Sequence, residues 1–383
     1  MHHAIRGSAA PGAVYQVGCN CAAYCTRTAT NFCTARFLHC TLLTLCLSLL
    51  LAACNAPDTG GTVDELASRQ PEAAAVAVIV NDQDPVSRQI AEYYLDRRGI
   101  PEGNLIHIGF RPGSDVMRPE VFAELKAAVD RQTPAQVQFY ALAWTAPYRV
   151  GCMSITTAFA AGFAAGFCAQ GCKATRASPY FDSGSRRPWD DFGWRPAMLL
   201  AGADLDAVKA LIDRGVAADG THPDGTGYLV STTDRRRNTR ARFYPGILLM
   251  QSERFEFELI RRNALQYRDD ILFYFTGLAR VEGINTNTFL PGAIADHLTS
   301  AGGKLTGSRQ MSSLRWLEAG ATGSYGSVTE PCAFVQKFPR PNIVIDRYLN
   351  GETLIEAYWK SVEWPGQGVF IGEPLAAPFR NNM

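Results

Sequence analysis

Apolar and polar positions alternate in blocks along residues 271–374. The run ILFYFTG is apolar and ends at a glycine, as expected for a buried strand. LPGAIADHLTSAGG has apolar residues near helical spacing before two glycines, which predicts a helix. A helix and a strand are expected in SSLRWLEAGATGSYGSV, a helix in ETLIEAYWKSV and a last strand in GQGVFIGEP. Strands and helices in alternation predict a parallel sheet with crossover helices.

The same alternation begins at residue 73. AAAVAVIVN, IPEGNLIHIGF and VQFYALAWTAP have the apolar character of strands, with helices between them in SRQIAEYYLDRRG and PEVFAELKAAVDRQ. Ser87 is the expected N-cap of the first helix, and Gly99 its stop. A strand, a helix and a further strand are expected across 196–232, then a helix in GILLMQSERFEFELIRRNALQ. We therefore predict one α/β domain over residues 73–383, with a mostly parallel, doubly wound central sheet flanked by helices.

Residues 147–196 break this pattern. They are rich in Gly, Ser, Pro, Cys and aromatic residues, and we interpret them as a long structured insertion. The domain has four cysteines, Cys152, Cys168, Cys172 and Cys332. An even number in an exported protein predicts disulfides rather than a metal site, because no histidine lies near these cysteines in sequence. Were only one pair to form, Cys168 with Cys172 is favoured, since so short a loop closes with little chain movement.

An export signal precedes the domain, within residues 1–53. TLLTLCLSLLLAA has the length of a signal-peptide core and is shorter than a comfortable membrane span of about 20 residues. It ends in Leu51-Ala52-Ala53-Cys54, which resembles the lipobox of bacterial lipoproteins. That resemblance implies a diacylglycerol on the Cys54 thiol and cleavage before it, and a plain signal peptide is the alternative. Asn55 favours the outer membrane.

The other N-terminal residues are excluded from the fold. Residues 1–35 fit no usual signal peptide, and we expect a translation start placed too early. Residues 54–72 are small and polar, as in a tether between a lipid anchor and a folded domain. The expected partners are therefore the membrane, reached through the N-terminal lipid, and a periplasmic ligand or protein.

Composition excludes some function classes. With 47% hydrophobic and 19% charged residues, the 383-residue chain is ordinary globular material. From Cys54 onward, 34 basic residues face 36 acidic ones, so no nucleic-acid partner is expected. The chain has no GxGxxG after the first strand and no GxxxxGKS or GxxxxGKT, which disfavours nucleotide binding by those two motifs. We expect no cofactor and no metal.

Polar residues at predicted loops are candidate ligand-binding groups, namely Asp82, Asp84, Asp234 and Glu330. Two carboxylates after the first strand suit a hard cation or a hydroxyl-rich ligand, and the alternative is an Asx turn that caps the next helix. A basic run after Asp234 either binds an anion or forms a solvated loop surface. Its members are Arg235, Arg236, Arg237, Arg240 and Arg242.

Several segments resemble a family of exported bacterial proteins of uncharacterised activity. They are RRGIPEGNL, SITTAFAAGF, SPYF, LPGAIADHLTSAGG, GATGSYGSVTEPC and GQGVFIGEPLAAPF. The resemblance spans roughly Ala73 to Arg380 and implies export, without implying an activity.

Residues 271–374 also resemble, more distantly, the gingipain-type cysteine peptidases, whose fold is a caspase-like α/β sheet. The matching pieces are Ser312 to Leu317, Gly320-Ala321, Gly351 to Ala357 and Gly372-Glu373-Pro374. That family carries a catalytic His in a turn after one strand and a Cys after the next strand. Here the two positions read Phe275-Thr276-Gly277-Leu278 and Leu298-Thr299-Ser300-Ala301-Gly302, with neither residue. The resemblance thus implies a caspase-like scaffold with a degenerate active site.

We therefore expect a binding or accessory protein, and a peptidase-like hydrolase is the alternative. His297 lies three residues before Ser300, so on the predicted helix their side chains can meet, with Asp296 or Asp270 as the acid of a Ser–His pair. Cys332 is the other candidate nucleophile. The competing interpretations are a His297 bonded to a neighbouring loop, and a Cys332 in a disulfide or buried as an inert thiol.

Overall fold

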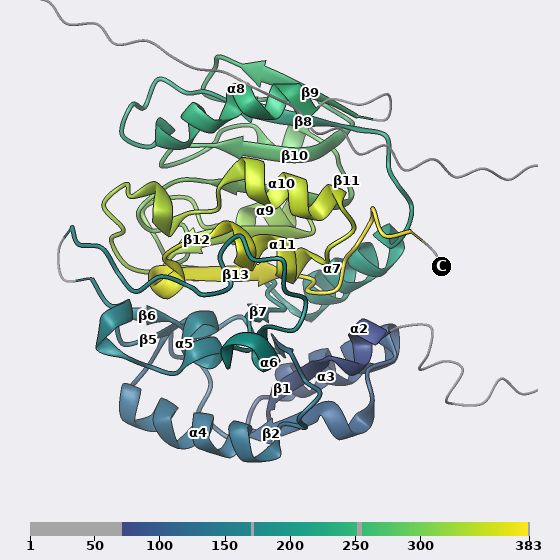
Figure 1. Ribbon diagram of the computed structural model, residues 1–383, viewed down its shortest axis with the longest axis vertical. Coiled ribbons are helices and arrows are strands. Elements are labelled where there is room, and N and C mark those ends of the chain that lie inside the picture. Colours follow the sequence, from purple (N-terminus) through teal and green to yellow (C-terminus); the bar gives the residue numbers. More distant parts are fainter. Residues whose placement is uncertain (1–70, 170–171, 251–254, 382–383) are drawn as a thin grey trace, which may run out of the picture. The chain divides into compact units, whose positions relative to one another are not determined.

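A ten-stranded sheet forms the centre of the domain. The computed structural model describes residues 71–169, 172–250 and 255–381, all within the compact unit Gly61–Met383. Strands follow the order β2-β1-β4-β7-β13-β12-β11-β10-β8-β9, and a second, three-stranded sheet has the order β3-β5-β6 (Figure 1). Helices pack on the large sheet, so the predicted mostly parallel α/β class is confirmed. The predicted signal peptide and Cys54 lie outside the described residues.

The strands are short and mostly apolar. Those of the large sheet are β1 (Val76–Asn81), β2 (Leu105–Ile108), β4 (Phe139–Leu142), β7 (Ala197–Leu199), β8 (Gly225–Val230), β9 (Phe255–Ile260), β10 (Ile271–Thr276), β11 (Phe289–His297), β12 (Gly323–Ser327) and β13 (Gly368–Gly372). Those of the small sheet are β3 (Val116–Met117), β5 (Arg149–Val150) and β6 (Met153–Ser154).

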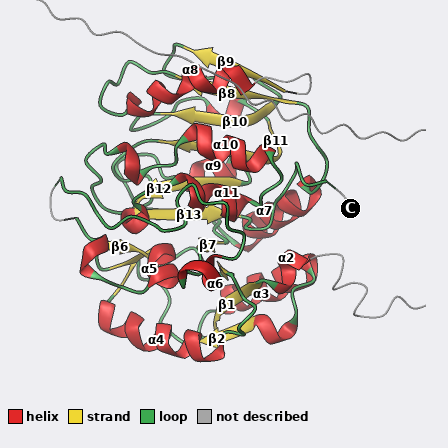
Figure 2. Ribbon diagram, viewed as in Figure 1, coloured by secondary structure: helices red, strands yellow, loops and turns green. Residues whose placement is uncertain are grey.

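The helices differ widely in length. They are α2 (Pro71–Ala74), α3 (Pro85–Arg98), α4 (Pro119–Gln132), α5 (Ile155–Ala161), α6 (Pro188–Phe192), α7 (Leu205–Ala218), α8 (Tyr244–Ile247), α9 (Leu314–Glu318), α10 (Pro341–Leu349) and α11 (Leu354–Ser361). Two pairs pack side by side, α3 with α7 and α10 with α11. Figure 2 shows how these helices and the connecting loops surround the strands.

Strand order changes direction at β1. The chain passes from β1 to β2 on one side and returns to β4 on the other, so that Val78 is paired with both Leu105 and Ala141. β13 is inserted between β7 and β12 and runs antiparallel to β12, with Phe370 opposite Tyr325. Its arrow in Figure 2 points opposite to that of β9.

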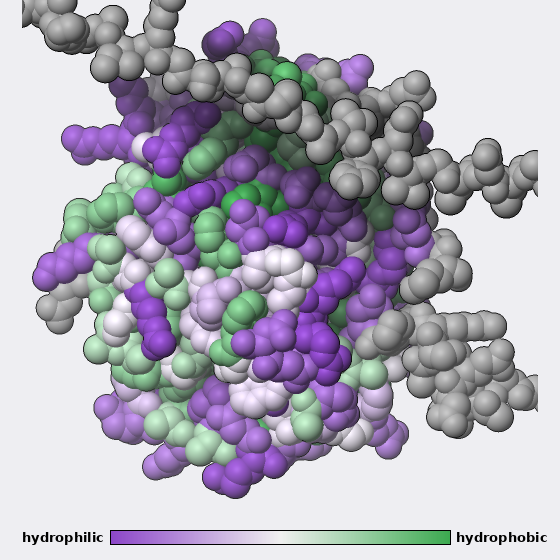
Figure 3. All heavy atoms as spheres, viewed as in Figure 1, coloured by the Kyte–Doolittle hydropathy of each residue, from purple (hydrophilic) through white to green (hydrophobic). Residues whose placement is uncertain are grey.

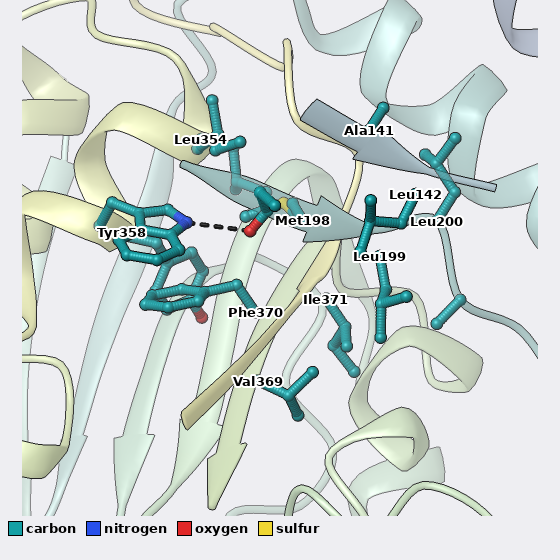
Figure 4. Close-up of a cluster of buried hydrophobic side chains, with 14 of the residues drawn as sticks. Ala141, Leu142, Met198, Leu199, Leu200, Leu354, Tyr358, Val369, Phe370 and Ile371 are labelled. Carbon is teal, nitrogen blue, oxygen red and sulfur yellow. Dashed lines mark hydrogen bonds between the residues drawn. The ribbon is translucent and has the colours of Figure 1, made fainter. Parts of the chain in front are cut away.

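Fully buried apolar side chains pack together where β4, β7 and β13 meet α11. Figure 4 shows Leu142, Met198 and Leu199 beside Phe370 and Ile371, all of them fully buried. Trp359 of α11 stacks on Phe370 and donates its indole N–H to the Ala197 carbonyl at 2.9 Å. Because strands covered on both faces must be apolar throughout, this region explains the long apolar runs in the sequence.

Two predicted helices are wrong. LPGAIADH forms β11, which pairs with β10 and β12, and FEFELI forms the edge strand β9. In β11 the fully buried Ala293, Ile294 and Ala295 are apolar on both faces, which removes the two-residue alternation that marks a half-exposed strand. Ser87 is also not an N-cap. Its buried hydroxyl accepts the Asn81 amide, and Asp84 caps α3 instead.

The predicted insertion carries β5 and β6 of the small sheet together with α5 and α6, whereas β3 precedes it in the chain. Ser154 caps α5 by accepting the Thr157 amide, as a serine before an apolar run favours. On the face drawn in Figure 3, apolar residues gather at the surface near β6 and α5 while hydrophilic side chains project elsewhere. In the described part of the chain, every helix is too short or too polar to cross a membrane.

Candidate ligand site at the carboxyl ends of the strands

The loops that follow β1, β4 and β7 enclose a pocket of about 460 Å³, which we call the switch-point pocket. It is lined by Asp84, Trp144–Ala146 and Gly202–Leu205, and by Thr306 from the loop between β11 and α9. Its walls are mostly apolar. Ligands of open α/β sheets bind outside the carboxyl ends of the strands, where the strand order reverses, and this pocket has that position.

Two helices begin at the pocket, and each is capped by an aspartate. Asp84 accepts the Val86 amide at 2.9 Å at the start of α3, and Asp204 accepts the Ala207 amide at 2.8 Å at the start of α7. Helix N-termini attract anions, but here the chain supplies the anions itself. Within the described ranges neither carboxylate belongs to an ion pair, so the pocket rim is acidic.

The pocket wall is held by short-range contacts. The Thr145 hydroxyl donates to the Gly202 carbonyl at 2.8 Å and accepts the Gly202 amide at 3.0 Å, which joins the ends of β4 and β7. Gly202 itself admits no side chain, because an added Cβ would lie 2.6 Å from a Val208 methyl group. Trp144 is almost fully buried and donates its indole N–H to the Pro147 carbonyl. These contacts fix the pocket shape before any ligand arrives.

The loop between β11 and α9 (residues 298–313) is anchored by a chain of hydrogen bonds. Asp234 pairs with Arg237 at 2.7 Å, and the Arg237 guanidinium donates to the Thr299 hydroxyl at 3.0 Å. Thr299 donates in turn to Gln310 Oε1, which also accepts the Ala301 amide, each at 2.8 Å. Asp234 therefore positions this loop, a role that its sequence context did not indicate.

His297 does not face Ser300 across a helical turn, because it is the last residue of β11. The ring is fully buried and both nitrogens are occupied: Nδ1 accepts the Trp316 indole N–H at 2.9 Å, and Nε2 lies 3.1 Å from the Met311 carbonyl. A carbonyl only accepts, so Nε2 carries the proton. Burial lowers the pKa of His297 to about 3. A neutral ring with both nitrogens engaged is not placed to act as a base for Ser300.

The two acids proposed for that pair also lie elsewhere. Asp296 faces the opposite side of the sheet from His297, as consecutive strand residues do, and pairs with the buried Arg240 at 2.5 Å. Burial raises the pKa of Asp296, against the opposing effect of Arg240. Asp270 precedes β10, at the other end of the strand from His297, and accepts the hydroxyls of Thr226 and Tyr228. The predicted Ser–His–Asp arrangement is therefore wrong in this structure.

All four cysteines of the domain form disulfides, as predicted, but the favoured pairing is wrong. Cys152 bonds Cys168, and Cys172 bonds Cys332 across 160 residues of sequence. Cys168 and Cys172 lie close in the chain, yet they bond to different partners. The partner of Cys168 lies between β5 and β6, and the partner of Cys172 lies in the loop after β12. Cys332 has no free thiol, so the disulfide interpretation holds and a nucleophilic role does not.

The remaining candidates have local roles. Asp82 lies 2.8 Å from Nδ1 of the half-exposed His107, outside the switch-point pocket. Glu330 accepts the Cys332 amide at 2.8 Å in the turn after β12. In the basic run Arg240 is buried and Arg237 is partly buried, whereas the other members are exposed. Two of the five arginines are thus structural and three are solvated. Only Asp84 among the four carboxylate candidates lines the pocket.

Sequence reasoning missed Trp144, Thr145, Asp204 and Thr306 as pocket residues. The signal for three of them was their position directly after an apolar strand, VQFYALAW or AMLLA. Thr306 has no such signal, since it reaches the pocket from a distant loop. Its hydroxyl donates a hydrogen bond to Asp115. Among the described residues, no group of three or more His, Cys, Asp or Glu side chains is arranged to hold a metal ion. Comparison with family models, curated proteins and solved structures found no match.

Proposed function

We propose that this is a lipid-anchored, exported protein of the bacterial cell envelope that binds a small ligand in the switch-point pocket. The pocket carries the proposal. It has the volume of small-molecule sites, is mostly apolar, and contains a few fixed polar groups. Its place at the strand-order reversal adds support. The degenerate caspase-like scaffold stays part of the proposal.

The charge of the pocket indicates the ligand class. Asp84 and Asp204 occupy the two helix N-termini, so an anionic ligand would have to approach two carboxylates. A ligand with an apolar body and an amine matches both the walls and the rim. We therefore expect a cationic ligand to bind better than an anionic one of the same shape.

Tryptamine and indole-3-acetate provide that comparison, because they share an indole and differ in the sign of the side-chain charge. Titration calorimetry should detect tryptamine binding to the wild-type protein and weaker or no binding of indole-3-acetate. Ala203→Trp fills the pocket from its exposed rim and should abolish the tryptamine signal. Ala217→Trp is the matched control and should bind normally, because Ala217 is exposed at the far end of α7, the helix that begins just after Ala203. Equal binding by both Trp variants would contradict the assignment.

The anchor is tested separately. Cys54→Ser should move the protein from the membrane fraction to a soluble or uncleaved form, because the lipid would otherwise hold it at about 0.8 kcal/mol per buried CH₂. A wild-type protein that is soluble, with an N-terminus beyond Cys54 and no lipid mass, would exclude the lipobox. The disulfides support an oxidising compartment.

No observation favours the hydrolase alternative. His297 is sealed between Trp316 and Met311, and Cys332 is bonded to Cys172. Serine-directed and thiol-directed probes should therefore leave the oxidised protein unlabelled. Labelling at Ser300 that disappears in His297→Gln would revive the alternative.

A further inference from the structure

We infer that a second pocket, on the other side of the β11–α9 loop, binds the oxyanion group of a small ligand. This pocket has a volume of about 420 Å³ and lies between the loop after β10 and residues 307–312. We call it the arginine pocket. Its polar side chains are Arg280, Glu282, Asn285, Ser308, Gln310, Ser312 and Arg315. It is independent of the switch-point pocket and of the function proposed for it.

Arg280 is the main cation of the arginine pocket. Its Nη2 has one contact, with the Arg309 carbonyl at 3.5 Å, the outer limit of a hydrogen bond, and among the described residues it has no acidic partner. Arg315 lines the pocket as well but is paired with Glu318. With Glu282 as the one acidic lining group, the cations exceed the anions. A guanidinium with most of its N–H groups unused is suited to a carboxylate or a phosphate, which it binds through two parallel hydrogen bonds.

The neutral groups of the arginine pocket are donors too. Ser308 Oγ accepts the Gln310 amide at 3.1 Å, and Ser312 Oγ accepts the Leu314 amide at 3.2 Å. In both serines the oxygen is used as an acceptor, which leaves the hydroxyl proton to be donated. Among the described residues neither proton has an acceptor.

The hydrogen bonds of Gln310 also fix which end of its amide faces outward. Its Oε1 accepts from Thr299 and from the Ala301 backbone amide, and a backbone amide can only donate. The side-chain NH₂ is therefore the free end, and within the described chain it has no acceptor. The Asp234–Arg237–Thr299 chain thus fixes an amide donor at the pocket wall. Two hydroxyls and an amide without an acceptor among the described residues, beside a guanidinium whose one acceptor lies at 3.5 Å, are matched by a ligand that only accepts, which is an oxyanion.

The test is a calorimetric titration of the whole protein with inorganic phosphate and with glutarate, against sodium chloride of equal ionic strength. Saturable binding of either anion is expected, and the one that binds more tightly identifies the ligand as a phosphoester or a carboxylic acid. Arg280→Gln should weaken binding by about tenfold or more, since charge-assisted hydrogen bonds are lost. Gln310→Glu keeps the oxygen that accepts from Thr299 and Ala301 and replaces the donor with a negative charge, so it should abolish binding.

Arg309→Gln is the matched control. Arg309 lies exposed on the β11–α9 loop, next to Gln310, and carries the same charge as Arg280. Its side chain does not line the pocket. Its replacement should change the affinity by no more than about twofold, because salt screens exposed charges beyond about 8 Å. The inference is overturned if neither anion gives a saturable signal above that of chloride. It is equally overturned if Arg309→Gln weakens binding as much as Arg280→Gln.

Discussion

Removing the Cys172–Cys332 disulfide should destabilise the protein more than removing Cys152–Cys168. The perturbation is a pair of double variants, Cys172→Ala with Cys332→Ala and Cys152→Ala with Cys168→Ala. A disulfide restricts the unfolded chain in proportion to the logarithm of the loop that it closes. For sequence separations of 160 and 16, the chain-entropy relation gives about 5 and about 3 kcal/mol.

Packing in the folded state acts in the opposite direction and has to be weighed. Cys152 and Cys168 pack against the apolar core, whereas Cys172 is exposed and Cys332 is partly exposed. Deleting two partly buried sulfur atoms adds to the cost of the short-loop variant, by less than about 1 kcal/mol per sulfur on an area basis. The long-loop variant should therefore remain the less stable of the two, by a margin smaller than the about 2 kcal/mol that loop length alone gives.

Urea denaturation of the oxidised proteins measures both effects. The long-loop variant should have the lower midpoint and a larger dependence on urea, because its unfolded state expands further. A peptide map without reducing agent must first confirm the two pairings. A short-loop variant with the lower free energy of unfolding would refute the reasoning, since packing rather than chain entropy would then dominate.

Other predictions concern buried charge and the anchored loop. Because burial lowers the pKa of His297 to about 3, the unfolded state alone takes up a proton as pH falls below about 6.5; the wild type should lose about 2.5 kcal/mol more than His297→Gln by about pH 4.5, measured by urea titration at each pH. Arg98→Met leaves the fully buried Glu373 without its cation and should lower the free energy of unfolding by about 3–5 kcal/mol. Arg97→Met breaks an exposed ion pair and should leave the urea midpoint nearly unchanged. Similar midpoints for both variants would contradict this. Arg237→Met removes the donor to Thr299 and should speed hydrogen exchange in the β11–α9 loop without changing exchange in β1; unchanged exchange in that loop would show that it is held by other contacts.

The sequence predicted the α/β class because buried parallel strands appear as apolar runs between amphipathic helices. β1, β4 and β10 follow that rule, and α7 follows it with its Asp204 cap. β11 does not, since its core consists of Ala293, Ile294 and Ala295, whose small side chains suit a helix as well as a strand. Pairing with β10 and β12 decides that this segment forms a strand and not a helix. These contacts involve residues distant in the chain, so the segment's own sequence does not predict them.

The sequence predicted where the ligand site lies, but not which residues line it. Asp84 was identified because it follows a strand, and the same rule selected Asp82, which turns toward His107 instead. Pairing of the cysteines, the burial of His297 and the contribution of Thr306 all depend on loops that approach from distant parts of the chain. Residue types and spacing do not show which distant loops come together in the fold. The even number of cysteines was nevertheless enough to predict that disulfides form.

β13 is the last strand along the described residues, and it lies in the middle of the sheet. Until β13 is available, β7 and β12 are bare edges, and the two halves of the sheet share no main-chain ladder. A growing chain therefore cannot close its core as it emerges, and it presents two unpaired strand edges that attract other chains. Such a polypeptide would stay open until β13 has been synthesised. Late closure of this kind is a hazard in a crowded cytoplasm, and it would suit the export that we propose for this protein.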